Sequence, residues 1–113
     1  MTSENLGRTM KKIECFIQPS KLDDLEEALW EGGVSGLTVS GVRGFGNQRV
    51  RSGPRLLEKL KIEIFVKDDQ VREIIAIIQK ATYTGKMGDG KIAVLPAENL
   101  VRIRTGEMGD SAV

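Results

Sequence analysis

The residues best suited to chemistry are a glycine-rich loop and two arginines that follow it. Residues 84–91 read TGKMGDGK, with three glycines in six positions. Such a loop can bend into a concave run of N–H groups, which binds phosphate oxygens. Lys91 adds a point charge, and Arg102 and Arg104 add planar guanidinium groups suited to polyphosphate. Because these arginines alternate along a strand-like run, we expect them to share one face. The pattern predicts a nucleotide phosphate site formed by both arginines with Gly88, Asp89, Gly90 and Lys91.

The same loop formally matches most of a Walker A motif, since Gly85, Gly90 and Lys91 fit G-x-x-x-x-G-K. Ile92 follows, where Mg²⁺ coordination needs Ser or Thr. The order of elements is also reversed, because a helical pattern precedes the loop and an apolar strand follows it. We therefore exclude a P-loop NTPase. The plainer alternative is a glycine-rich turn beside a lysine, and the two arginines favour phosphate binding over it.

Composition narrows the function classes. The chain has 113 residues, a net charge of +1, one cysteine and no histidine. One domain is expected, with no overall field that would recruit nucleic acid or membrane. Without histidine, neither a metal site nor a dedicated enzyme is expected.

Cys15 lies in an apolar alternation typical of a buried, inert thiol. Because a single cysteine cannot form an internal disulfide, a reduced cytoplasmic setting is expected. Residues 1–9 are polar and unpatterned, which predicts a disordered N-terminal extension.

Hydrophobic periodicity predicts an α+β fold. Ser20 and Asp68 are expected to cap the two helices. The order β-α-β, loop, β-α-β is that of a ferredoxin-like domain, with one four-stranded antiparallel sheet and both helices on one face. The expected strands cover residues 12–18, 37–43, 59–66 and 92–95, the helices about 20–32 and 68–83, and a final extended piece 100–104.

The sheet face away from the helices is expected to carry Phe16, Thr38, Glu63 and Phe65. Two phenylalanines on an uncovered face favour a partner, most simply another copy of the chain. An RNA-recognition sheet also stacks bases on exposed aromatics. The near-neutral charge and the lack of the expected flanking pattern of basic and aromatic residues disfavour that interpretation.

Several co-linear segments resemble the PII signal-transduction family, from residue 10 to the end of the chain. The glycine loop is similar to the family's B-loop signature, and the arginine pair lies in a matching C-terminal segment. The segments that carry the resemblance are residues 10–14, 21–25, 36–39, 44–46, 61–64, 84–92 and 102–107.

The resemblance implies a homotrimer with three nucleotide sites between subunits, where ATP and ADP compete. The phosphates would meet residues 88–91 of one subunit and Arg102 and Arg104 of its neighbour. Gln48 and Lys59 match the residues with which the family holds 2-oxoglutarate and its Mg²⁺. The adenine pocket would involve Phe16, Thr38, Glu63 and Phe65, and the nucleotide would be closed over by Gly44, Phe45, Gly46 and Gln48.

The chain departs from the family in its T-loop, about residues 44–58, which docks on target proteins in ordinary members. The loop is short and has no tyrosine to uridylylate, since the only tyrosine is Tyr83. Asn47 replaces the usual arginine, which removes one phosphate ligand. The loop is basic, with Arg49, Arg51 and Arg55 and with Lys59 at its end. These residues are either a solvated charge run or a contact with an anion or an acidic partner. The candidate effector ligands are Gln48, Arg49, Arg51 and Lys59.

We therefore expect residues 10–113 to form a PII-like domain, with a B-loop at 84–91 and a C-terminal segment at 97–113. The expected function is a trimeric sensor of ATP, ADP or AMP that controls a target such as a transporter, linked to bicarbonate. The alternative is a nitrogen-regulatory protein that senses 2-oxoglutarate with MgATP and controls ammonium uptake or nitrogen metabolism.

Overall fold

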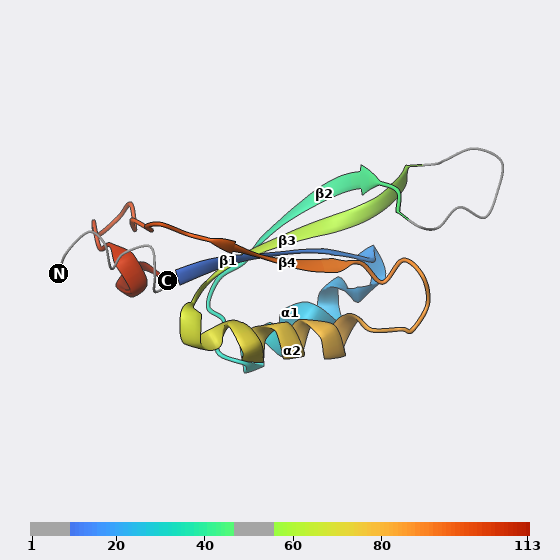
Figure 1. Ribbon diagram of the computed structural model, residues 1–113, viewed down its shortest axis with the longest axis horizontal. Helices are drawn as coiled ribbons and strands as arrows, with labels where there is room; N and C mark the ends of the chain where they lie inside the picture. Colours follow the sequence, from blue (N-terminus) through green and yellow to red (C-terminus); the bar gives the residue numbers. More distant parts are fainter. Residues whose placement is uncertain (1–9, 47–55) are drawn as a thin grey trace.

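One antiparallel sheet of four strands, in the order β2-β3-β1-β4, organises the computed structural model, which describes residues 10–46 and 56–113. Two helices lie side by side on one face of this sheet (Figure 1). The ferredoxin-like α+β fold predicted from the sequence is confirmed. The elements are β1 (Met10–Ile17), η2 (Pro19–Lys21), α1 (Leu22–Glu31), β2 (Thr38–Gly44), β3 (Leu57–Lys67), η3 (Asp68–Gln70), α2 (Val71–Thr82), β4 (Lys91–Pro96) and η4 (Gly109–Ala112).

The core forms where the alternating apolar residues of β1 and β3 meet the apolar stripes of the helices. Ile13 pairs with Ile64 and Cys15 pairs with Ile62 across the two strands. All four side chains are buried, because alternation sends them to the helix-covered face. The helices contribute Leu25, Leu29, Ile74 and Ile78 to the same cluster.

Both helices begin differently from the prediction. Ser20 and Asp68 do not cap them, because each lies inside a short 3-10 segment that leads into the helix. Pro19 starts the first segment, where its fixed φ and missing N–H are tolerated. At the second, the Lys67 N–H donates to the Gln70 side-chain oxygen at 2.8 Å. The Gln70 side chain thus satisfies the N–H of the residue that precedes the second 3-10 segment.

The β2–β3 hairpin extends past the helices as a two-stranded arm (Figure 1). Its register runs from Thr38 opposite Glu63 to Gly44 opposite Leu57. The residues beyond its end, 47–55, lie outside the described residues. The predictions made for Asn47, Gln48, Arg49, Arg51 and Arg55, and for the extension 1–9, therefore stay predictions.

The expected extended piece 100–104 is a turn. Val101 forms one isolated bridge with Met108, and the Gly106 N–H donates to the Arg102 carbonyl at 2.7 Å. The Arg102 N–H in turn donates to the Glu107 carbonyl at 2.8 Å. The inference that Arg102 and Arg104 share one face of a strand is therefore wrong. Hydrogen bonds across the turn replace the strand pairing that this inference assumed.

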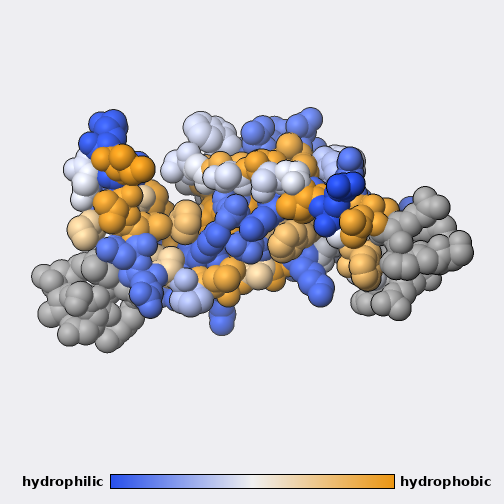
Figure 2. Space-filling view, turned by 90° about the horizontal axis from the view of Figure 1, so that it is seen from above, coloured by the Kyte–Doolittle hydropathy of each residue, from blue (hydrophilic) through white to orange (hydrophobic). Residues whose placement is uncertain are grey.

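The sheet face away from the helices combines ion pairs with exposed aromatics. Lys12 pairs with Glu14 at 2.9 Å and also with Glu63, and the hydrogen bond from Lys12 lowers the pKa of the Glu14 carboxyl. Phe16 and Phe65 are 36% and 44% exposed. Figure 2 looks down on this face and shows charged and apolar residues side by side across it.

Neither helix of the described part is long and apolar enough to cross a membrane.

Burial at the centre of the sheet raises the pKa of the Cys15 thiol to about 11. At pH 8 only about one molecule in a thousand would then carry the reactive thiolate. We expect a maleimide or disulfide reagent to label the folded protein far more slowly than the urea-unfolded chain. Stoichiometric labelling of the folded protein at the unfolded rate would contradict this burial.

Candidate functional site

The glycine loop between α2 and β4 takes a shape that only glycine allows. Gly85, Gly88 and Gly90 have φ values of +83°, +98° and +107°, which disfavour any residue with a side chain. At Gly90 an added Cβ would lie 1.7 Å from the Phe16 carbonyl oxygen. The loop is therefore pressed against the backbone of β1, and Gly90 makes that contact possible.

Asp89 closes the loop from inside. Its carboxylate accepts hydrogen bonds from the Thr84 and Gly85 N–H groups, at 2.8 and 2.9 Å, and from the Thr84 hydroxyl. The bonds from Thr84 hold the pKa of Asp89 below its ordinary range. The side chain of this predicted phosphate-site residue thus stabilises the turn, and its charge faces backbone donors.

Two side chains from the sheet hold the middle of the loop. The Lys59 ammonium, from β3, donates to the Gly88 carbonyl at 2.9 Å. The Gln18 amide, just after β1, donates to the same oxygen at 2.9 Å. Lys59 was predicted from the sequence as an effector ligand, and here it joins the base of the β2–β3 arm to the glycine loop. Gln18 was not predicted, because a lone glutamine after a strand carries no sequence signal.

An open cleft of about 500 Å³ lies between the arm and the glycine loop. Its polar lining is cationic, because Lys59 and Lys91 border it. The cleft also includes Val42, Arg43 and Met87, which the sequence did not single out; Val42 is placed there because it pairs with Lys59 across the arm. The predicted residues that the structure brings together here are Phe16, Gly44, Phe45, Gly46, Lys59, Gly88, Gly90 and Lys91.

Four more of the predicted residues lie in a second cleft, of about 460 Å³, near the C-terminal segment. Thr38, Glu63, Phe65 and Arg102 line it. Phe65 is six residues from Lys59 along β3, or about 20 Å at the usual strand rise. The adenine pocket expected from the sequence is thus divided within one chain, since Phe16 lies in the first cleft. Arg104 lines neither cleft.

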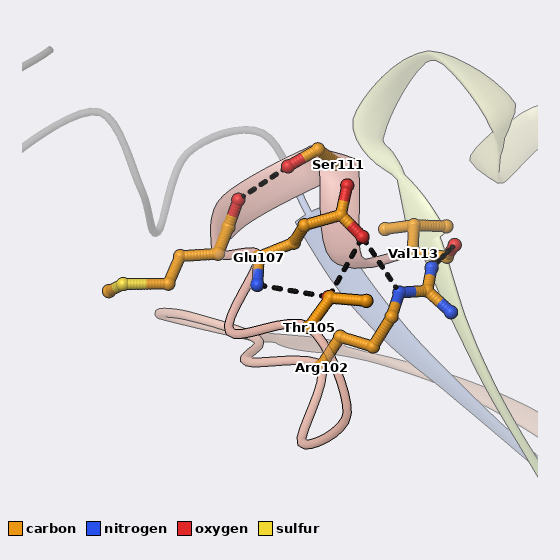
Figure 3. A network of polar contacts seen from close by, with 6 residues as sticks. Arg102, Thr105, Glu107, Ser111 and Val113 are labelled. Carbon is orange, nitrogen blue, oxygen red and sulfur yellow. Dashed lines mark hydrogen bonds and ion pairs between the residues drawn. The ribbon is translucent and has the colours of Figure 1, made fainter.

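Arg102 is held by its own segment (Figure 3). Its Nε lies 3.3 Å from a Glu107 carboxylate oxygen, and its Nη2 donates to the Val113 carbonyl at 3.3 Å. The Thr105 hydroxyl donates to the same Glu107 oxygen at 2.9 Å. The guanidinium is thereby ordered at the border of the second cleft, where it can meet an anion.

Cationic side chains border both clefts: Lys59 and Lys91 border the first, and Arg102 borders the second. Within residues 10–46 and 56–113 no group of three or more His, Cys, Asp or Glu side chains could hold a metal ion. The described geometry therefore combines a phosphate-type loop, an aromatic side chain and an ordered guanidinium.

Comparison with known proteins identifies the class of protein. Residues 10–107 match the model of the family described as Nitrogen regulatory protein P-II. The chain belongs to this family of regulatory signalling proteins.

Individual relatives are similar over nearly the whole chain. The nitrogen regulatory protein P-II of Azospirillum brasilense is 47% identical over 112 residues, covering 92% of this chain and 100% of that protein. The nitrogen regulatory protein GlnK of Escherichia coli K12 is 44% identical with the same coverage. A crystal structure of Arabidopsis thaliana PII bound to citrate has a TM-score of 0.81 and 40% identity, covering 92% of this chain and 89% of that one.

These alignments also indicate a deletion. In both bacterial comparisons 92% of the 113 residues, about 104, are aligned over 112 positions that cover the relative completely. The relatives therefore have about eight residues without a counterpart here. The size of this deletion agrees with the short loop between β2 and β3 that the sequence suggested.

The contact of Gly90 with β1 gives a stability prediction. Gly90→Ala should lower the free energy of unfolding by at least about 2 kcal/mol, because both the clash with Phe16 and the positive φ must be relieved. Gly36→Ala is the control, since nothing lies within 4 Å of its added Cβ and it should stay within about 1 kcal/mol of wild type. Urea unfolding followed by circular dichroism measures both. Equal midpoints for the two variants would contradict the packing of the loop.

Proposed function

We propose that this chain is a regulatory protein that binds adenine nucleotides between neighbouring copies of itself, and that it is not an enzyme. The observation that supports this proposal is the division of the predicted site between two clefts, which places Phe65 about 20 Å from Lys59 along β3. One nucleotide cannot span both clefts of a single chain in the expected way. Two copies can supply one cleft each.

In the proposed complex the phosphates lie on the glycine loop and Lys91 of one copy. Arg102 and Arg104 reach them from the next copy, so the cations come from both sides. Phe16, Thr38, Glu63 and Phe65 form the adenine pocket, and the short segment Gly44, Phe45, Gly46 and Gln48 closes over the ligand. A homotrimer with three such sites would also cover the exposed phenylalanines of the open sheet face.

The relatives favour nitrogen regulation over the bicarbonate-linked function that the sequence suggested. The names of the bacterial relatives cited above describe nitrogen regulatory proteins. The Arabidopsis relative was solved with citrate, which shows that a member of this family accepts a small carboxylate. We propose that ATP, ADP and AMP are the primary ligands, with 2-oxoglutarate and Mg²⁺ as second effectors held by Gln48 and Lys59. The signal would pass to a target protein through the β2–β3 arm.

Nucleotide binding is tested first with single variants. Lys91→Ala and Arg102→Ala should each weaken ATP binding at least about tenfold, because each removes a charge-assisted contact. Isothermal titration calorimetry with ATP, ADP and AMP measures this. Lys80→Ala, on the helix α2 and outside both clefts, is the matched control and should bind like wild type.

Mixing the two variants tests whether the site is shared. If the loop and the arginine act from different copies, a co-refolded mixture of Lys91→Ala and Arg102→Ala regains about a quarter of the wild-type sites in randomly mixed rings. Light scattering should give about three times the chain mass for the same sample. A monomer, or no regained sites in the mixture, would overturn the shared site.

The second effector is tested by coupling. If 2-oxoglutarate and MgATP share a site, each should tighten the binding of the other by the same factor, at least about fivefold. Calorimetry with 2-oxoglutarate, with bicarbonate and with chloride, at constant pH and ionic strength, separates the alternatives. Tightening by bicarbonate alone would favour the carbon-linked function, and tightening by 2-oxoglutarate would favour nitrogen regulation.

A further inference from the structure

Two side chains from outside the glycine loop hold the Gly88 carbonyl. It accepts one hydrogen bond from the Gln18 amide and one from the Lys59 ammonium, both at 2.9 Å. From this we propose that Gln18 is a positioning residue for phosphate binding: it keeps this carbonyl bound to the protein and unavailable to repel a ligand anion. The proposal rests on the proposed function and adds a residue to that site.

Gln18 is well placed for this role because its backbone is fixed on both sides. It follows β1 directly, two residues after the Phe16–Lys91 pair that begins the contact with β4. Its own carbonyl accepts a hydrogen bond from the Lys21 N–H at 3.0 Å, at the start of α1. The side chain therefore reaches the loop from a rigid support.

The loop needs such support at this residue. Gly88 adopts φ +98°, and both neighbouring peptides could rotate, since glycine restricts neither. A carbonyl oxygen turned into the cleft would face the phosphates and oppose their binding. Fixing the peptide before the ligand arrives lowers the ordering cost of binding.

The two donors differ in what an incoming anion does to them. The Lys59 ammonium also borders the cleft, so an anion attracts it away from Gly88. The Gln18 amide is neutral, so the charge of the anion does not attract it in the same way. Gln18 therefore retains the carbonyl while Lys59 is free to contact the ligand, and this division of roles explains why one oxygen has two donors.

The test uses Gln18→Met, which removes the donor at nearly constant size and charge. Its control is Lys80→Met, an exposed residue of α2 that lines neither of the two clefts. We expect ATP affinity of the Gln18 variant to fall about three- to tenfold, with a smaller change for AMP, because fewer phosphates face the loop. Amides of residues 85–90 should also exchange hydrogen faster without nucleotide. The control should match wild type in both measurements.

The outcomes separate this inference from the proposed function. Wild-type protein that binds no adenine nucleotide overturns the proposed function and, with it, the role of Gln18 in phosphate binding. Wild-type protein that binds ATP, with unchanged affinity in Gln18→Met, overturns only the positioning role. An equal loss for ATP and AMP together with a lowered unfolding midpoint would also overturn it, since that combination marks a general loss of stability.

Discussion

The pairing of β1 with both β3 and β4 is the constraint on which the rest of the structure depends. It buries Ile13, Cys15 and Ile17 under the helices and leaves Phe16 on the opposite face. The glycine loop packs against the same strand, since Lys91 pairs with Phe16 and Gly90 lies close to the Phe16 carbonyl. Core and candidate site are thus two faces of one strand, and a shift of register by one residue would exchange them.

Polar contacts in the site mostly stabilise the protein before any ligand binds. The Asp89 carboxylate binds backbone N–H groups of its own loop, and the Lys59 ammonium binds the Gly88 carbonyl. The Arg102 guanidinium binds the Glu107 carboxylate and the Val113 carbonyl. Such contacts are a form of preorganisation, because charged side chains held in place lose less entropy when an anion arrives. They also require the ligand to compete with intramolecular partners. A multiply charged ligand is better able to do so than a singly charged one.

The fold could be predicted from the sequence because alternation and helical spacing are strong in β1, β3 and both helices. The helix starts could not, since a 3-10 segment precedes each helix in place of the expected cap. The strand predicted around Arg102 was wrong because hydrogen bonds across the 102–107 turn outweighed a weak alternation. The candidate site residues follow from the family resemblance, and eight of them line the first cleft. Their division into two clefts could not be predicted, because it depends on where the β2–β3 arm, the glycine loop and the C-terminal turn lie around the sheet.

That division has a consequence for assembly. A contact that joins the first cleft of one copy to the second cleft of the next uses different surfaces on the two partners, so it is heterologous. Such head-to-tail contacts either close into a ring or continue into a filament, and only the closed form leaves no cleft unmatched. In a closed ring every bound ligand touches two chains and every chain touches two ligands. Occupation of one site would then be sensed by two subunits, each through a different cleft, and each subunit would respond to two sites.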